Sequence, residues 1–299
     1  MRVLVTGAGG FVGRHLTRFL ASVGDEVIAC PGPEGPGALD VTAANAVQRR
    51  VAEATPDAIV HLAGISSVAW SHANAGKTMA VNVIGTTNLL EAVRTEAPRA
   101  RLLLVGSGEM YGRLQDGRPA REEDPLRPLS PYASSKGAAE QVAGQYAASY
   151  GLQVVCARPF NHLGAGQSPQ FVVPSFARQI AEVKHGRREA VIEVGDLSPV
   201  RDFLHVVDVV RGYRSLLLPS TPTGVYNLCS GTGRSIRSVL DELLKLAGVQ
   251  AEVRVDPARL RPIEIPWLVG DSSRASAIGW SPQHAVTDAL REVLQECGV

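Results

Sequence analysis

The chain opens with the sequence MRVLVTGAGGFVGRHLTRFL, at residues 1–20. Four of its first five residues are apolar and two of them are β-branched, a glycine-rich turn follows, and apolar side chains then recur at helical spacing. This order predicts a strand, a tight turn and a helix. Glycines at Gly7, Gly10 and Gly13 would let the turn close and let the backbone approach a pyrophosphate at the helix N-terminus. We therefore predict a dinucleotide-binding turn, with the spacing Gly-x-x-Gly-x-x-Gly rather than Gly-x-Gly-x-x-Gly.

Strand and helix patterns alternate through the first half of the chain. Strand-like runs lie at 26–29, 58–62, 102–105 and 153–157, and helical stretches lie at about 43–55, 80–96 and 133–149. Repeated strand–helix–strand units predict a parallel sheet with helices on both faces, and ligands bind such sheets at the carboxyl ends of the strands. The predicted fold class is α/β, with a Rossmann-type doubly wound parallel sheet and a smaller C-terminal α/β substrate domain.

The pattern changes after Arg158-Pro159, where loops rich in glycine and proline interrupt shorter elements. We assign residues 1–158, with about 203–225, to the dinucleotide-binding domain. Residues 159–202 and about 226–299 form the predicted substrate-binding domain.

Composition excludes several classes of protein. The chain has 299 residues, 45% of them apolar, and a formal net charge of +1, so nucleic acid and membrane are not expected as main partners. No apolar run reaches the roughly 18 residues that span a bilayer, and we expect neither a signal peptide nor a location outside the cytoplasm. The four cysteines lack metal-ligand or redox spacing, so we expect free thiols and no metal site; they stand at positions 30, 156, 229 and 297.

Tyr132 and Lys136 stand four residues apart in a predicted helix, with Ser107 25 residues ahead of the tyrosine. Positions i and i+4 lie on one helix face, so both side chains can act on one small group such as a carbonyl. A nearby ammonium favours a phenolate, and we expect Lys136 to lower the pKa of Tyr132 from about 10. Such pairs are common on helices, and the glycine turn together with Ser107 gives this one its significance.

These motifs together resemble the extended short-chain dehydrogenase/reductases that act on nucleotide sugars. The resemblance runs nearly end to end. It is carried by the glycine turn, the His-Leu-Ala-Gly of residues 61–64, Ser107 and Tyr132-x-x-x-Lys136. Downstream, residues 158–167, 201–203 and 260–266 resemble the branch that uses GDP sugars. Within that branch the chain resembles enzymes that reduce the C4 keto group of a GDP-linked keto-deoxy sugar.

The resemblance implies that a nicotinamide delivers hydride to C4 of the keto sugar. Tyr132 would donate a proton to the oxygen, Ser107 would hydrogen-bond the same oxygen, and Lys136 would hold the nicotinamide ribose and tune the tyrosine. General acid catalysis of this kind contributes about 10² to 10⁴ in rate.

Cofactor contacts follow from the same resemblance. They are assigned to Gly7, Gly10, Phe11, Val12, Gly13, Asp40, Val41, Leu62, Ala63, Gly64, Tyr132 and Lys136. The second strand runs into Ala-Cys-Pro-Gly-Pro at residues 29–33, which has neither the acidic residue typical of NAD(H) enzymes nor a basic one typical of NADP(H) enzymes. The cofactor is therefore NADP(H) or NAD(H). Asp40 would help to hold the adenine, or would cap the next helix.

Substrate contacts are also taken from the resemblance. They are assigned to Ser107, Glu109, Asn161, Val172, Arg178, Arg201, Arg261 and Glu264. The planar guanidinium of an arginine suits a diphosphate, and Glu264 would accept from ribose hydroxyls. Taken singly, each arginine could equally form an exposed salt bridge worth less than about 1 kcal/mol.

Glu109 supports an alternative reaction, because sugar-nucleotide 4,6-dehydratases of the same superfamily place a glutamate two residues after the Ser or Thr. Two features favour the reductase: the loop after the second strand lacks the dehydratases' paired arginines, and Leu-Gly-Ala-Gly-Gln follows Asn161-His162. A nucleotide-sugar 4-epimerase stays open. A non-catalytic dinucleotide sensor would not need serine, tyrosine and lysine together.

The helices predicted around 83–96 and 133–149 carry small and apolar residues beyond what one sheet face needs. The resemblance implies a homodimer through these helices, and the alternative is tight packing within the monomer. D-rhamnose is favoured over 6-deoxy-D-talose as the product sugar by resemblance alone.

Overall fold

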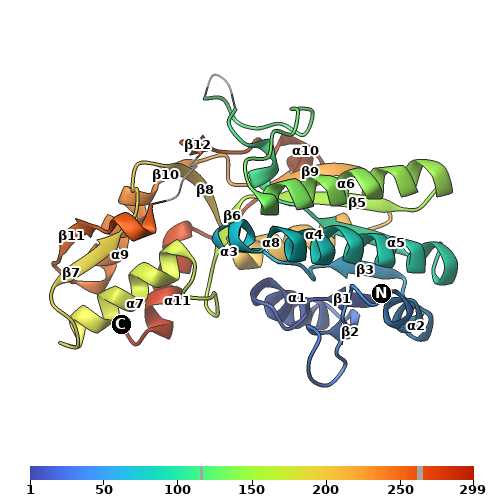
Figure 1. Cartoon of the computed structure of the whole chain (residues 1–299), viewed down its shortest axis with the longest axis horizontal. Coiled ribbons are helices and arrows are strands. Elements are labelled where there is room, and N and C mark those ends of the chain that lie inside the picture. The colour runs from blue at the N-terminus through green and yellow to red at the C-terminus, as the bar shows by residue number, and fades with distance from the viewer. Residues whose placement is uncertain (115–116, 261–264) are drawn as a thin grey trace.

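The computed structural model describes residues 1–114, 117–260 and 265–299. Figure 1 shows a central sheet between layers of helices, and beside it a smaller α/β body that contains the C-terminus. The central sheet has six parallel strands in the order β2-β1-β3-β4-β5-β9. The predicted α/β class with a Rossmann-type parallel sheet is confirmed.

Five of the six strands of this sheet agree closely with the predicted runs, and β9 was not among those runs. The six strands are β1 (Arg2–Thr6), β2 (Glu26–Cys30), β3 (Ala58–His61), β4 (Arg101–Val105), β5 (Val154–Pro159) and β9 (Gly224–Leu228). Val3 of β1 pairs with Val27 on one side and with Ala58 on the other. The chain therefore adds β2 on one side of β1 and then β3 on the other side. The strand order reverses between β1 and β3, and ligands of such sheets bind at the carboxyl ends of the two strands at this switch point.

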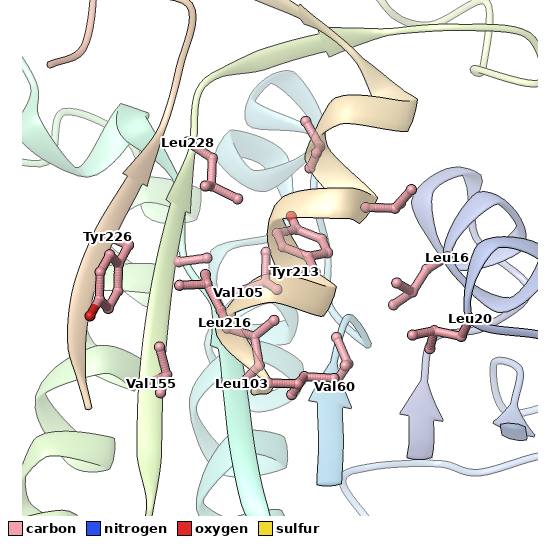
Figure 2. Close-up of a cluster of buried hydrophobic side chains, with 14 of the residues drawn as sticks. Leu16, Leu20, Val60, Leu103, Val105, Val155, Tyr213, Leu216, Tyr226 and Leu228 are labelled. Atoms are coloured by element: carbon pink, nitrogen blue, oxygen red, sulfur yellow. The ribbon is translucent and has the colours of Figure 1, made fainter. Parts of the chain in front are cut away.

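Helices cover both faces of the sheet because apolar strand residues alternate between them. The helices of this body are α1 (Phe11–Ser22), α2 (Ala44–Ala54), α3 (Val68–Ala73), α4 (Ala75–Met79), α5 (Gly85–Glu96), α6 (Pro131–Tyr150), α8 (Val206–Leu216) and α10 (Ser273–Ala277). On one face, Leu16 of α1 and Tyr213 of α8 pack over Val60 and Leu103 (Figure 2). On the other, α2, α5 and α6 cover Ile59 and its neighbours.

One predicted helix differs from a regular α-helix. The stretch expected at about 80–96 begins with a π-helical turn, η1 (Ala80–Ile84), which continues directly into α5. A π turn holds one extra residue and occurs often at functional sites.

The smaller body contains the remaining regular elements. Its strands are β6 (Asn161–Leu163), β7 (Val191–Val194), β8 (Val200–His205), β10 (Gly233–Ser235), β11 (Glu252–Val255) and β12 (Trp267–Leu268). Its helices are α7 (Val172–Lys184), α9 (Ile236–Ala247) and α11 (Val286–Glu296), which share an apolar core. Two 3₁₀ turns, η2 (Gly108–Tyr111) and η3 (Pro257–Arg259), lie in connections.

The chain returns to the large sheet with α8 and β9, and Trp280 also packs into the core beside that sheet. The domain boundaries proposed above stay a prediction. Among the described residues, no helix has both the length and the apolar character needed to cross a bilayer.

Helix α1 approaches the end of β1 very closely at Gly13. A Cβ atom built on Gly13 would lie 2.3 Å from the Gly7 carbonyl oxygen. We expect Gly13→Ala to lower the free energy of unfolding by about 1–3 kcal/mol, since overpacking of this kind forces the backbone apart. Denaturant unfolding measures this change. Gly32→Ala is the control because its Cβ would meet nothing within 4 Å, and an equal effect in both variants would contradict the assigned close contact.

Candidate active site

The glycine turn lies at the switch point and leaves room for a ligand backbone. Gly7 has a φ of +71°, and a Cβ built on it would lie 2.6 Å from the Ala63 nitrogen. Gly10 occupies the N-cap position of α1, so the amides of Phe11 and Val12 lie in the first turn, where a helix has no partners of its own for them. The Val12 side chain packs against the core of the sheet. These donors and this shape fit a dinucleotide pyrophosphate.

The segment after β3 forms the second wall of the switch point. The Leu62 amide donates to the Thr6 carbonyl at 3.1 Å, and the Ala63 amide donates to the Thr6 hydroxyl at 3.3 Å. A Cβ on Gly64 would lie 3.5 Å from the Lys136 Nζ. The structure therefore brings the predicted segment 62–64 together with both the glycine turn and the predicted lysine.

Ser107, Glu109 and Tyr132 meet where β4 ends and α6 begins. Ser107 caps η2, and its hydroxyl accepts a hydrogen bond from the Glu109 amide at 3.2 Å. Tyr132 lies in the first turn of α6, which Ser130 caps by accepting from the Ala133 amide. The buried phenol of Tyr132 hydrogen-bonds the Ser107 side chain. Ser107 and Tyr132, the two residues predicted to act on the substrate oxygen, are therefore neighbours, and Glu109 lies beside them.

The expectation that Lys136 lowers the pKa of Tyr132 is wrong in this structure. Burial raises the pKa of Tyr132 and the hydrogen bond with Ser107 opposes this, while the Glu109 carboxylate adds to the rise; together they bring the pKa to about 12. Lys136 instead donates from Nζ to the Val105 carbonyl at 2.8 Å, and burial lowers the pKa of its ammonium to about 8. Both shifts are set mainly by desolvation, which disfavours the charged form of each group.

Asn82 is a site residue that the sequence analysis missed. It is buried in the π turn, where its Oδ1 accepts from the Ile65 amide at 2.7 Å and its Nδ2 donates to the Ser135 hydroxyl at 2.8 Å. Ser135 in turn donates to the Tyr132 carbonyl at 2.7 Å. Asn82 thus ties the segment after β3 to the first turn of α6. A buried amide inside an amphipathic helix would have been the signal.

His61 completes a second set of buried hydrogen bonds under the site. Its Nδ1 is 2.7 Å from the Thr6 hydroxyl, and its Nε2 is 3.2 Å from the Thr86 hydroxyl. Burial, with a smaller contribution from the charge of Lys136, lowers the pKa of His61 to about 3. The imidazole is therefore neutral and has a structural role between β1, β3 and α5.

A buried ion pair fixes α6 relative to β5. Arg158 donates to Glu140 from Nε at 3.0 Å and from Nη2 at 2.5 Å, and its Nη1 donates to the Tyr111 hydroxyl at 2.8 Å. Tyr111 donates to the Asn227 Oδ1 at 2.7 Å. Glu140 lies on α6 with Tyr132, and Tyr111 lies in the turn that Ser107 caps. This network therefore holds together the two segments that carry the predicted catalytic residues.

Apart from Ser107 and Glu109, which are described above, the predicted substrate residues fall into three groups. Asn161 lies on β6 and Arg201 on the adjacent β8, where Arg201 is buried and donates to the Ile265 carbonyl at 2.7 Å. Val172 begins α7, but Arg178 on the same helix is 67% exposed and pairs with Glu182 at 3.1 Å. This matches the exposed ion pair considered as its alternative. Arg261 and Glu264 lie outside the described residues, and all these assignments stay predictions.

Asp40 does not cap a helix. Its carboxylate accepts from the Thr42 amide at 2.9 Å and from the Thr42 hydroxyl at 2.7 Å. Helix α2 begins only at Ala44, and its N-cap residue is Ala43. The capping alternative was therefore wrong, because the short side chain closes a local turn instead. Val41 is buried, and its carbonyl accepts from Asn88 of α5 at 2.9 Å. Their role toward the cofactor stays a prediction.

Loss of one partner in the buried ion pair leaves an uncompensated charge. We expect Glu140→Gln to lower the free energy of unfolding by about 3 kcal/mol or more. The matched control is Asp241→Asn, which breaks the exposed Arg237–Asp241 pair and should cost less than about 1 kcal/mol. Urea unfolding of both variants checks this, and equal losses would show that burial does not set the strength of the Arg158–Glu140 contact.

Comparison with known proteins gives a consistent result. The family model for GDP-mannose 4,6 dehydratase matches residues 38–293. GDP-6-deoxy-D-mannose reductase of Pseudomonas aeruginosa is 37% identical over 297 residues, which are 99% of this chain and 96% of that protein. The structure of RMD from Pseudomonas aeruginosa complexed with NADPH has a TM-score of 0.90 and 36% identity, covering 99% of this chain and 98% of that one. The UDP-glucose 4-epimerase of Thermus thermophilus, in complex with NAD, has a TM-score of 0.89 and 32% identity, covering 100% and 99%. The chain therefore belongs to the GDP-mannose 4,6-dehydratase family, within the extended short-chain dehydrogenase/reductases of nucleotide sugars that the sequence motifs predicted.

Proposed function

We propose that this protein reduces the C4 keto group of GDP-4-dehydro-6-deoxy-D-mannose with NADPH or NADH and forms GDP-D-rhamnose. The observation that carries the proposal is the buried Tyr132 phenol, hydrogen-bonded to Ser107, with Lys136 of the same helix beside the segment that meets the glycine turn. The similarity to a GDP-6-deoxy-D-mannose reductase over nearly the whole chain supports the choice of substrate.

Ketone reduction needs a hydride at carbon and a proton at oxygen. When bound, the dinucleotide supplies the hydride. With a pKa of about 12, Tyr132 carries its proton throughout the neutral range. It is therefore prepared to act as the acid, while the Ser107 hydroxyl orients the same oxygen. The Glu109 carboxylate assists by keeping the phenol protonated. Lys136, next to Gly64, is placed to hold the nicotinamide ribose.

Recognition of the GDP portion is assigned to the smaller body. Arg201 offers a guanidinium anchored on β8, and Asn161 lies on the neighbouring strand. Arg261 and Glu264 are proposed by resemblance to complete the diphosphate and ribose contacts. Val172 lies at the N-terminal end of α7, whereas Arg178 contributes only if it leaves Glu182.

The choice between the two cofactors is left open by the residues at the end of β2. This strand ends at Cys30 and is followed by Pro31, so no acidic side chain there would repel a 2′-phosphate or bind the free ribose hydroxyl. Relatives of known structure bind NADPH in one case and NAD in another. We therefore propose that both are accepted.

Glu109 supports a second candidate, GDP-mannose 4,6-dehydratase, because it lies beside Ser107 and the family model is that of a dehydratase. A dehydratase begins by oxidising C4, which requires the tyrosine to accept a proton. The raised pKa of Tyr132 works against that first step and favours reduction. The two differ in a direct test: a dehydratase forms the keto sugar from GDP-mannose without added reduced cofactor.

We also infer a cytoplasmic homodimer joined through α5 and α6. Ile84 and Tyr150 are each 53% exposed, and both lie on this helix layer. Tyr146 and Tyr150 of α6 form a ring pair with centroids 5.2 Å apart, and Tyr150 is its exposed member. A second copy would cover these rings. The four free cysteines are in keeping with a reducing compartment.

Removal of the Tyr132 hydroxyl tests the assigned acid. In Tyr132→Phe we expect kcat to fall by about 10² to 10⁴ because the proton donor is lost. Binding of NADPH should change little. Absorbance of the reduced nicotinamide measures turnover with the keto sugar, and calorimetry measures cofactor binding. Tyr150→Phe, an exposed tyrosine on the same helix, is the control. Near-normal turnover of Tyr132→Phe would disprove the assignment.

The pH dependence should report Lys136 rather than Tyr132. The lysine is charged below its pKa of about 8 and loses its proton above it, whereas the tyrosine keeps its proton up to about 12. We therefore expect kcat/KM to decline as pH rises through about 8. Lys136→Arg should move this decline to higher pH, because guanidinium stays charged. An unchanged pH profile in that variant would mean that another group titrates.

A further inference from the structure

One arginine joins the glycine turn to the segment that follows Asn161. Arg14 of α1 donates from Nη1 to the Gly9 carbonyl at 2.7 Å and from Nη2 to the Gly166 carbonyl at 2.9 Å. Gly9 belongs to the dinucleotide side, and Gly166 belongs to the segment that leaves β6 on the substrate side, 152 positions from the arginine. We call these three residues, Gly9, Arg14 and Gly166, the Arg14 bridge.

Neighbouring side chains reinforce the same contact between α1 and this segment. The His15 Nε2 lies 2.8 Å from the Ala165 carbonyl, and since a carbonyl only accepts, Nε2 carries the hydrogen. The Phe11 ring is parallel to the His162 ring, with centroids 6.1 Å apart, and meets His15 edge-on at 5.3 Å. The first turn of α1 is therefore joined to residues on both sides of the Leu163-Gly164 step.

Gly166 is also held from its other side. Its amide donates to the Glu296 carboxylate, at the end of α11, at 2.7 Å. Its φ is +86°, and a Cβ built on it would lie 3.1 Å from the Arg14 Nη2. The Gly166 turn is thus contacted by α1 on one side and by α11 on the other.

We propose that Arg14 is a positioning residue that couples binding of the dinucleotide to binding of the nucleotide sugar. Both carbonyls of the Arg14 bridge belong to glycines, which lose more conformational freedom than other residues when they are ordered. A ligand that orders the Gly9 turn also orders the Gly166 turn through the guanidinium, and with it the strand that carries Asn161. The second ligand then meets a segment that is already ordered, so each ligand raises the affinity for the other by the same factor.

This coupling rests on the function proposed above for the identity of its two ligands. A different role for Arg14 would be direct contact with a dinucleotide phosphate. Direct contact would weaken NADPH binding in an Arg14 variant by the same factor whether or not the second site is filled. Loss of coupling instead removes only the improvement that the second ligand brings.

Calorimetry of NADPH binding with and without saturating GDP measures the coupling. We expect GDP to tighten NADPH binding to the unaltered protein by about five-fold or more, and NADPH to tighten GDP binding equally. Arg14→Gln should bring both factors close to one, and Arg14→Lys should retain part of the effect. Arg18→Gln is the matched control: Arg18 is exposed one turn later on α1, and within the described ranges it has no hydrogen-bond partner. It should behave as the unaltered protein does.

The proposal is overturned if the unaltered protein shows no coupling, if Arg14→Gln keeps it, or if Arg14→Gln weakens NADPH equally with and without GDP. Turnover distinguishes this from failure of the proposed function. NADPH oxidation by the keto sugar without coupling would refute the role of Arg14 alone. Coupling without turnover would refute the reductase alone.

Discussion

The buried ion pair between Arg158 and Glu140 is the contact on which the arrangement of the site depends. The groups proposed to be catalytic lie on separate elements, and no local sequence preference sets the distance between them. Arg158 on β5 binds the carboxylate of α6 and the hydroxyl of Tyr111, which in turn binds Asn227 on β9. Because a charge in the interior needs a partner, these four elements can pack well in only one way. The position of α6 against the turn after β4 is a consequence.

Within that frame, burial controls the chemistry more than charge pairing does. Burial disfavours the charged form of both Tyr132 and Lys136, which raises the pKa of the tyrosine and lowers that of the lysine. A protonated phenol suits a reaction that ends with a proton on oxygen. The same scaffold with a more hydrated tyrosine would suit a reaction that begins with removal of a proton from a substrate hydroxyl. Members of one family can therefore differ in direction through solvation of a shared residue, without a change in the residues themselves.

Local patterns predicted the fold and the site to different extents. The strand, glycine turn and helix at the start of the chain could be predicted because each depends on neighbouring residues. That Tyr132 and Lys136 share one helix face could be predicted because residues four positions apart lie on the same face. The bond from Lys136 to Val105, the link from Asn82 to Ser135, and the Arg14 bridge were not, because they join segments far apart in sequence. Burial, which reversed the expected pKa shift of the tyrosine, likewise depends on how distant segments pack.

The π turn at Ala80–Ile84 lets Asn82 face the site while the following helix, α5, faces the sheet. A regular helix of the same sequence could satisfy only one of these two orientations. One extra residue rotates everything after it by about 100° around the helix axis. Asn82 can therefore direct its amide toward the site while Leu89 and Leu90 of α5 still face the sheet. Removing one residue there would restore a regular helix, but either the amide or the leucines would then point the wrong way. Because of the irregular turn, the orientation of Asn82 around the helix axis is independent of the orientation of the α5 leucines that pack in the core.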